Sequence, residues 1–232
     1  MMKKLLERKH LMLLAVLLLV ALVEPMLADR SEHSRIFSAV VAALVNLGVL
    51  LVIFDQRWER RLALFLLAVA WLSNITHEVF RDWAQIAAVV YHCFVLIFLG
   101  FAVVVILKRI FQQEAIRTDA VIGALCGYAL AAFAWGNAYG LIYLLSPGSF
   151  RVADAIVGQL GEWYLQRFYF GYFSITTLTS LGYGDITPIG TLVLWLSCIE
   201  VLFGQFYIAV VVAQLVGLRL AQSIKRDHPD SE

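Results

Sequence analysis

Long stretches without a charged residue dominate this chain of 232 residues. A helix rises about 1.5 Å per residue and the hydrocarbon core of a bilayer is about 30 Å thick, so about 20 apolar residues span it. Hydrophobic residues make up 62% of the chain and charged residues 15%. These proportions exclude an ordinary globular domain, a disordered chain and a disulfide-stapled secreted scaffold. The sequence therefore predicts a polytopic membrane protein.

Eight stretches contain no Asp, Glu, Lys or Arg, and they run over 11–23, 36–54, 62–76, 83–107, 120–150, 168–184, 186–199 and 201–218. The third reaches membrane-spanning length only by extending to about Val79, and the last two join across Glu200 into one helix over 190–218. With 168–184 set aside, this gives six spans. The expected fold class is an all-α integral membrane protein with six transmembrane helices.

The distribution of Lys and Arg predicts the orientation of these spans. With a cytoplasmic N-terminus, only five of the eighteen Lys and Arg residues lie outside, namely Arg30, Arg35, Arg81, Arg151 and Arg167. Cytoplasmic loops are enriched in Lys and Arg, so both termini are expected in the cytoplasm. Residues 1–28 also have the three-part form of a signal peptide. Because Met26 is not small and Glu24-Pro25 interrupts the segment, a retained first helix is expected instead.

The segment 146–189, between the fifth and sixth spans, differs from the rest. A turn cluster, Ser146-Pro147-Gly148-Ser149, precedes an aromatic run expected to form a helix over 163–178. Since the flanking spans run in opposite directions, this segment must enter and leave the membrane on the same side. We therefore expect a re-entrant loop that enters as a helix and returns as extended chain. Non-helical backbone at this depth must be buried in protein or line water.

Residues 179–185 read Thr-Ser-Leu-Gly-Tyr-Gly-Asp. Glycine reaches positive φ at little steric cost, and alternating left- and right-handed conformations turn successive carbonyls to one side. Four such strands around an axis would form rings of oxygen atoms that replace the hydration shell of a cation. One loop supplies a quarter of each ring, so this reading requires a tetramer.

This heptapeptide resembles the potassium-channel signature Thr-Thr-Val-Gly-Tyr-Gly-Asp, and 118–217 is similar to the two-helix pore module of bacterial potassium channels. The whole chain resembles six-span bacterial proteins of that family. Two positions depart from the signature. Ser180 replaces a threonine whose hydroxyl lines the innermost ion site of the family, and Leu181 replaces a valine that contributes its carbonyl. Neither change removes an oxygen ligand.

The resemblance implies roles for individual residues. The filter that binds the permeant K⁺ would be Thr179, Ser180, Leu181, Gly182, Tyr183 and Gly184, with the carbonyls of Ser180, Leu181, Gly182 and Tyr183 as ligands. Thr176, Thr177 and Asp185 would support the filter, and Gly204 would be the hinge of the inner helix. The residues Gln205, Ile208 and Val212 follow one helical face and would line the cavity. The alternatives are a solvated loop for Asp185 and simple close packing for Gly204.

Glu200 is a carboxyl group in the middle of a span, where acids are costly and usually functional. We expect it to bond Thr176 or Thr177 and to brace the filter from behind. The alternative is a proton-sensing gate.

The N-terminal region, 1–117, is expected to hold four helices, followed by the pore module over 118–220 and a short cytoplasmic tail over 221–232. Within the module, an outer helix is expected over 119–145. Stretch 83–107 contains no Lys or Arg, so it lacks the repeated arginines of a voltage sensor. Its only histidine, His92, is interpreted as a packing residue, and the cysteines Cys93, Cys126 and Cys198 as buried small hydrophobes.

Three functions remain in competition. The leading prediction is a homotetrameric, potassium-selective channel of the bacterial inner membrane that conducts K⁺ passively. The alternatives are a weakly selective cation channel and a non-conducting membrane subunit. No cofactor is expected apart from the permeant ion, and the partners are the lipid bilayer and further copies of the chain, with a separate regulatory subunit left open. A net charge of +1 and the absence of catalytic motifs argue against nucleic-acid binding and against an enzyme.

Overall fold

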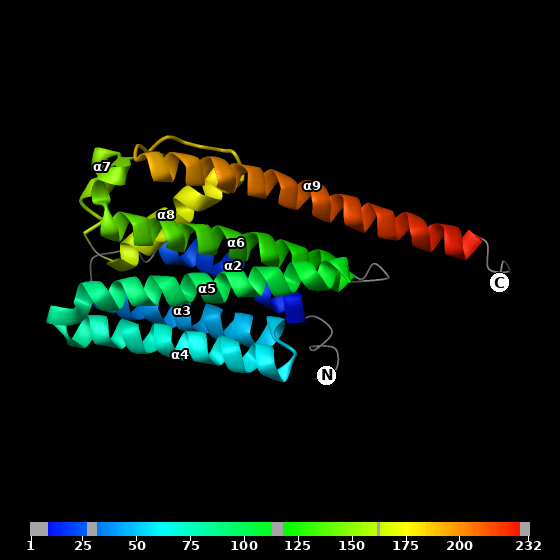
Figure 1. Cartoon of the computed structure of the whole chain (residues 1–232), viewed down its shortest axis with the longest axis horizontal. Helices are drawn as coiled ribbons and strands as arrows, with labels where there is room; N and C mark the ends of the chain where they lie inside the picture. The colour runs from blue at the N-terminus through cyan, green and yellow to red at the C-terminus, as the bar shows by residue number, and fades with distance from the viewer. Residues whose placement is uncertain (1–8, 27–31, 113–117, 162, 228–232) are drawn as a thin grey trace.

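A computed structural model describes residues 9–26, 32–112, 118–161 and 163–227, almost all of them in helices (Figure 1). The predicted basic positions Lys3, Lys4, Arg8, Arg30 and Arg117 lie outside the described residues, as does the C-terminal end of the predicted tail.

The N-terminal region contains four long helices, α2 (Lys9–Met26), α3 (Glu32–Ile53), α4 (Arg57–Val79) and α5 (Ala84–Phe111). A short 3₁₀ turn, η1 (Arg81–Trp83), connects α4 to α5. Helices α3, α4 and α5 lie along the long axis of the molecule (Figure 1). Their apolar side chains merge with those of α6 into one buried cluster that also includes Tyr207 and Val211 of α9.

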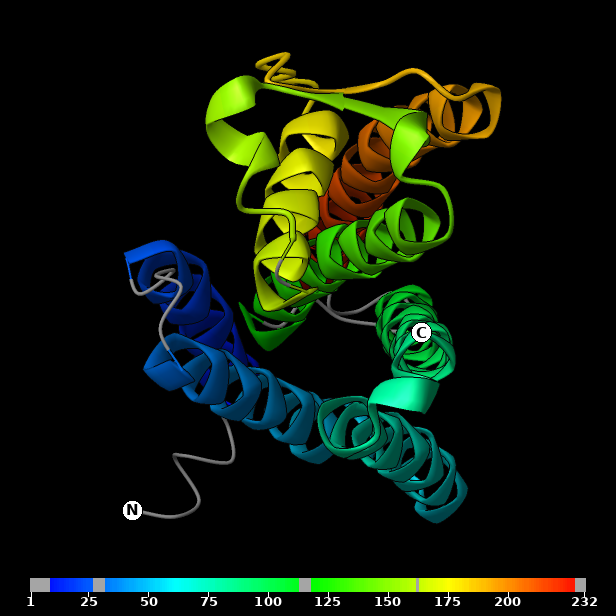
Figure 2. The ribbon, with the colours of Figure 1, turned by 90° about the vertical axis from the view of Figure 1, so that its left-hand side faces the viewer.

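The C-terminal region begins with α6 (Thr118–Leu145) and ends with α9 (Thr191–Asp227). Between them lie η2 (Pro147–Ser149), β1 (Phe150–Val152), α7 (Asp154–Val157), α8 (Trp163–Leu178) and β2 (Ile186–Pro188). Helix α8 packs against both α6 and α9 (Figure 2). The helix expected over 163–178 is α8. The prediction that the last helix ends at 218 is wrong, because neither Gly nor Pro interrupts the sequence between Leu218 and Asp227.

The expectation of an all-helical fold needs one correction. Strands β1 and β2 form a two-stranded antiparallel sheet with Arg151 opposite Thr187. Ala153 N–H also donates to the Asp185 carbonyl at 2.8 Å, and the N–H groups of Ile189 and Gly190 donate to Ser149 O. These bonds tie the chain that follows 185 to the loop that precedes α8. Each strand is only three residues long, too short for a periodic sequence signal.

Three helices are long and apolar enough to cross a membrane, and they cover Ala84–Phe111, Val121–Leu145 and Thr191–Gln214. The sequence predicted six spans. The apolar parts of α2 and α3, Lys9–Ala21 and Phe37–Ile53, are shorter. Helix α4 has a charged first turn that includes Glu59. Among the described residues, length and composition thus support half of the predicted spans.

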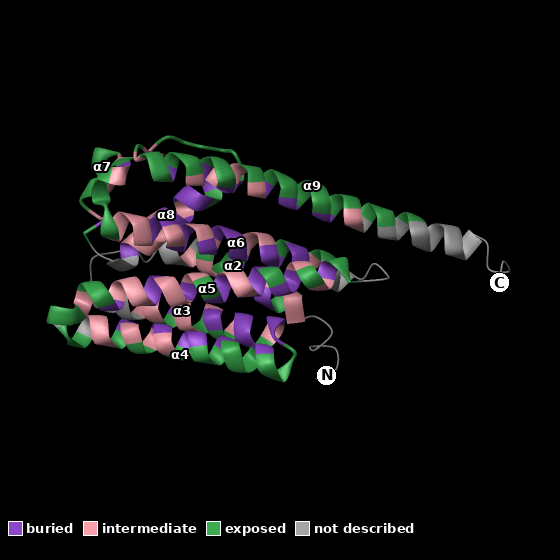
Figure 3. Ribbon diagram, in the orientation of Figure 1, coloured by how far each residue is buried: buried purple, intermediate pink, exposed green. Residues whose placement is uncertain are grey.

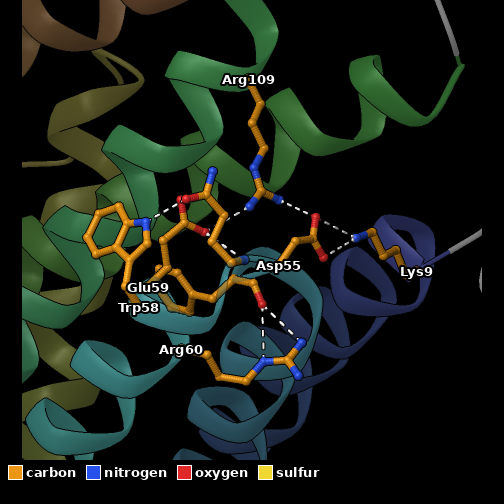
Figure 4. Close-up of polar contacts among 8 residues, drawn as sticks. Lys9, Asp55, Trp58, Glu59, Arg60 and Arg109 are labelled. Carbon is orange, nitrogen blue, oxygen red and sulfur yellow. Dashed lines mark hydrogen bonds and ion pairs between the residues drawn. The ribbon is translucent and has the colours of Figure 1, made fainter.

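Charged side chains connect α2, α4 and α5 at one end of the bundle (Figure 4). Asp55, in the turn before α4, accepts bonds from Lys9 at 2.9 Å and from Arg109 at 2.8 Å. Arg109 also bonds Glu59 at 3.1 Å. Lys9 and Arg109 were both predicted to be cytoplasmic, and the structure brings them to the same end of the bundle.

Candidate ion-conduction site

The backbone after α8 alternates in hand. Ser180, Gly182 and Gly184 have φ values of 60°, 54° and 85°, and they are the positive-φ residues of the described chain. Leu181 and Tyr183, which lie between them, have ordinary negative φ. Alternation is the local condition for turning successive carbonyls toward one side, and the glycines at 182 and 184 adopt it without a Cβ penalty.

Main-chain bonds anchor this segment on the last turn of α8. Ser180 N–H donates to Thr177 O at 2.9 Å, and the N–H groups of Leu181 and Gly182 donate to Thr176 O at 2.8 and 3.1 Å. Thr176 and Thr177 thus contact the segment through their carbonyl oxygens. The Thr176 hydroxyl is used elsewhere, because it donates to Phe173 O within the helix. The Thr179 hydroxyl likewise donates back to Ile175 O at 2.7 Å.

Asp185 closes the outer end of the segment. Its Oδ2 accepts a bond from the Tyr172 hydroxyl of α8 at 2.7 Å, and its Oδ1 accepts from Ile186 N–H at 3.0 Å. The ring of Tyr172 stacks on that of Tyr183, with centroids 6.3 Å apart and planes 4° apart. Asp185 therefore bonds back to α8, and the alternative of a purely solvated loop carboxylate does not describe it.

Glu200 of α9 is fully buried and bonds to two other helices. Its Oε2 accepts from the Tyr139 hydroxyl of α6 at 2.7 Å, and its Oε1 lies 2.5 Å from Ser174 Oγ of α8. The expectation that Glu200 bonds Thr176 or Thr177 is wrong in its partner. Ser174 of α8 faces Glu200; Thr176, two positions on, points to a different face of the helix, and Thr177 lies almost one turn further along it.

The Ser174 hydroxyl lies within hydrogen-bond distance of two acceptor atoms but has a single hydrogen to donate. Its Oγ lies 2.8 Å from Ala132 O as well as 2.5 Å from Glu200 Oε1, and a hydroxyl has only one hydrogen to donate. If the side chain at position 200 donated a hydrogen to Ser174 Oγ, the Ser174 hydrogen could go to Ala132 O, and both contacts would be hydrogen bonds. All three side chains, Tyr139, Ser174 and Glu200, have 0% exposure, so their hydrogen-bond partners must come from the surrounding protein.

Gly204 lies against the C-terminal end of α8. A Cβ at this position would be 2.3 Å from Leu178 O and 3.1 Å from Leu178 Cδ1. The same carbonyl accepts a bond from the Tyr128 hydroxyl of α6 at 3.1 Å. This contact supports the close-packing interpretation of Gly204. Its role as a hinge stays a prediction.

A second glycine contact sets α8 against α6. A Cβ on Gly136 would lie 2.8 Å from Gly171 Cα and 2.9 Å from Phe170 O. Small residues allow two helix backbones to approach each other this closely. The crossing places Phe170 and Phe173 in an aromatic cluster with Tyr139 and Phe150. The aromatic run of α8 therefore packs partly inside the chain.

The three predicted cavity-lining residues, Gln205, Ile208 and Val212, are exposed on α9. Gln205 Nε2 lies 3.0 Å from Ser180 Oγ, so this face of α9 borders the N-terminal end of residues 179–184, the predicted filter segment. The filter segment is exposed as well, with Leu181 at 56% and Tyr183 at 67%. In the most apolar stretch of α9 only 22% of the residues are buried, against 50% in the corresponding stretch of α5 and 56% in that of α6 (Figure 3).

Two further predictions concern single residues outside the filter. His92 is buried, its Nδ1 lies 2.8 Å from Asn137 Oδ1, and Asn137 Nδ2 donates to His92 O at 2.7 Å. This fits a packing histidine. The cysteines are free, and of the three expected to be buried Cys126 is buried, Cys93 is half-buried and Cys198 is exposed, so the expectation is wrong for Cys198. Within the described chain, no group of three or more His, Cys, Asp or Glu side chains could hold a metal ion.

Several site residues carried no recognised signal in the sequence. Tyr128, Tyr139 and Ser174 each place a hydroxyl in an apolar helix, and in a membrane such groups need a partner. A list of the polar side-chain groups within the predicted spans would have included these three residues as candidates. Such a list would not have shown which groups bond each other, because Tyr139 and Glu200 are 61 positions apart in the sequence.

A comparison with protein families finds a match over part of the chain. The model described as "Ion channel" matches residues 138–218, from the last part of α6 through α8 and the filter segment into α9. No curated protein and no solved structure matches the chain.

The matched region and the apolar helices support an ion-channel pore module. A chain with such a module is a membrane protein, and the match favours transport over catalysis.

Proposed function

We propose that this chain forms a homotetrameric, potassium-selective channel that conducts K⁺ passively across the bacterial inner membrane. In this proposal six helices span the bilayer and both termini are cytoplasmic. K⁺ would bind to the carbonyls of residues 180–183, with the side chains of Thr179 and Ser180 at the inner end.

The observation that carries this proposal is the alternation of positive φ at Ser180, Gly182 and Gly184 directly after α8. Rings of backbone carbonyls replace the hydration shell of K⁺ in potassium channels. The amide groups of 180–182 are bonded to α8, which leaves the carbonyls as the groups free to face an axis.

The requirement for further copies follows from burial. Non-helical backbone in the hydrocarbon region must be buried in protein or line a water-filled cavity. In a single chain, residues 179–184 are exposed and α9 offers a long uncovered apolar face. Three more copies around the filter would enclose the segment and cover α9, and closed rings of identical subunits are common among homo-oligomers.

Bi-ionic reversal potentials of the purified protein in planar bilayers test the selectivity. The proposal expects K⁺ and Rb⁺ to permeate and Na⁺ to be largely excluded. Liposomes that take up no Rb⁺ under any condition, together with a monomeric or dimeric particle by mass measurement, would instead support a non-conducting subunit. Near-equal permeability of Na⁺ and K⁺ would support a weakly selective cation channel, which the Ser180 and Leu181 departures favour.

Gating in this proposal does not use S4-type voltage sensing. Between Ala84 and Leu107 there is no Lys or Arg to move through the field. Glu200 would act as a structural brace between α6, α8 and α9, because its contacts connect these three elements and are fully buried. A proton-sensing gate at Glu200 is the alternative, and Gly204 would provide the bend of the inner helix.

A further inference from the structure

We propose that Gln205 is a positioning residue that holds the Ser180 side chain at the inner end of the filter and thereby sets how well this end discriminates among alkali cations. This inference rests on the proposed function. The contact that carries it joins α9 to the filter, with Gln205 Nε2 3.0 Å from Ser180 Oγ across 25 positions of sequence.

Ser180 needs restraint because of its backbone. It is the one non-glycine residue with positive φ in the described chain, at 60°. Such a conformation is uncommon for a residue with a Cβ and persists only where the surroundings hold it. The Ser180 N–H is held by Thr177 O at 2.9 Å, and its hydroxyl is held by Gln205. The residue is thus fixed through both its main chain and its side chain.

Serine at this position loses a restraint that threonine has. A second heavy atom on Cβ restricts χ1 of threonine, whereas the serine hydroxyl is free to occupy all three staggered rotamers. A β-branched side chain is also more strained at positive φ. In this chain the Gln205 amide can select one serine rotamer without that added strain. The hydrogen bond from Gln205 thus restricts χ1 of Ser180, as the methyl group of a threonine would by steric contact.

The direction of the bond leaves the oxygen available to a cation. A hydroxyl oxygen has two lone pairs, and donation from Gln205 Nε2 uses one of them. The second can face an ion at the inner end of the filter. Both residues are exposed in the single chain, on the surface that the tetramer would enclose. A Gln205 that only lined a wet cavity would not depend on what occupies position 180.

A double-mutant cycle separates these two roles. Gln205→Met keeps the length of the side chain and removes its N–H, and Ser180→Ala removes the acceptor. Gln214→Met makes the same chemical change nine positions further along α9, on the opposite face of the helix. The readout is the K⁺ to Na⁺ permeability ratio from reversal potentials of the full-length protein.

Gln205→Met is expected to lower this ratio roughly three- to tenfold, the factor that corresponds to one hydrogen bond of ordinary strength. Gln214→Met should change it by no more than about twofold, as is usual for substitutions away from a specific contact. In the Ser180→Ala background, Gln205→Met should have no further effect. An equal loss in both backgrounds, or no loss in the wild-type background, would overturn the inference.

A second readout does not require an open pore. Ions bound to the folded protein raise its thermal stability, so the K⁺ concentration that gives half of the maximal stabilisation reports the affinity of the filter. Gln205→Met should raise this concentration by the same factor, and only when Ser180 is present. A wild-type protein that conducts Na⁺ and K⁺ equally would contradict the proposed function instead. The coupling between the two positions would then be measured from conductance.

Discussion

Tyr139 of α6 and Glu200 of α9 form a 2.7 Å hydrogen bond between two side chains that are fully buried. Ser174 of α8 lies on the other carboxyl oxygen of Glu200, so one acid connects α6, α8 and α9. Polar groups buried in an apolar interior are stabilising when every partner is present and costly when one is removed.

Replacement of Glu200 by Gln or by Leu should therefore have opposite consequences. Gln retains an oxygen for Tyr139 and adds an N–H for Ser174 Oγ, whose own hydrogen can then go to Ala132 O. Leu removes the carboxyl partner of the Tyr139 hydroxyl, at a cost of about 1–3 kcal/mol, whereas the Ser174 hydroxyl keeps Ala132 O as its acceptor. Thermal unfolding in detergent should place Glu200→Gln at or above the wild type and Glu200→Leu well below it.

Equal destabilisation by the two substitutions would show that the carboxyl group itself is required. Open probability measured across pH for Glu200→Gln separates the two roles proposed for this residue. A profile that matches the wild type removes the gate and leaves the brace.

Gly204→Ala should disturb the end of the pore helix. The added Cβ would be 2.3 Å from Leu178 O, a backbone atom that moves only if the filter segment moves with it. We expect a loss of about 1–3 kcal/mol in stability, the range for overpacking a filled site, together with a loss of K⁺ flux. Thermal unfolding and Rb⁺ uptake into liposomes measure the two effects.

Gly217→Ala is the matched control, because a Cβ there meets nothing within 4 Å. It should be neutral or stabilising by up to about 1 kcal/mol through helix propensity. If Gly204→Ala abolishes flux but leaves stability unchanged, the bend of the helix is its important property, and the contact with Leu178 is not.

Glu59 and Asp55 should contribute very differently to the ion-pair cluster around Arg109. The Glu59 side chain is 8% exposed, and its carboxylate also accepts a bond from Gln56 N–H in a capping box. The Asp55 side chain is 55% exposed. Glu59→Ala is expected to cost about 1–3 kcal/mol, and Asp55→Ala less than about 1 kcal/mol.

Thermal unfolding at low and high salt checks this difference. At 1 M salt the Debye length falls to about 3 Å, so the small effect of Asp55→Ala should shrink further while that of Glu59→Ala persists. Equal effects of the two substitutions would contradict the role assigned to burial.

Opening should show no steep dependence on membrane voltage. Moving one elementary charge through the field is worth about 2.3 kcal/mol per 100 mV, and the part of α5 before Lys108 carries no Lys or Arg. Single-channel recordings between −100 and +100 mV are expected to give a nearly constant open probability. An open probability that rises sigmoidally over a few tens of millivolts would locate moving charge elsewhere in the protein.

The local elements of the pore region could be predicted from the sequence because their signals are short-range. A turn cluster before an aromatic run predicted the helix over 163–178, and the glycines at 182 and 184 predicted the alternating backbone that is observed. The left-handed conformation of Ser180 was not signalled, since serine has no preference for it. The sheet between 150–152 and 186–188 was missed because pairing between short segments depends on their positions in space.

The sequence by itself determined that this chain is a membrane protein, and it predicted the helix over 163–178 and the alternating backbone that follows, because hydrophobicity and glycine placement are properties of neighbouring residues. Only the tertiary structure decided that Glu200 bonds Ser174 and Tyr139, and that Gln205 reaches Ser180. Those contacts depend on the rotation and axial offset of α8 and α9, which are set by close approaches such as Gly136 to Gly171 and Gly204 to Leu178. A shift of two positions along a helix turns a side chain to a different face, so no local pattern could have selected the partner.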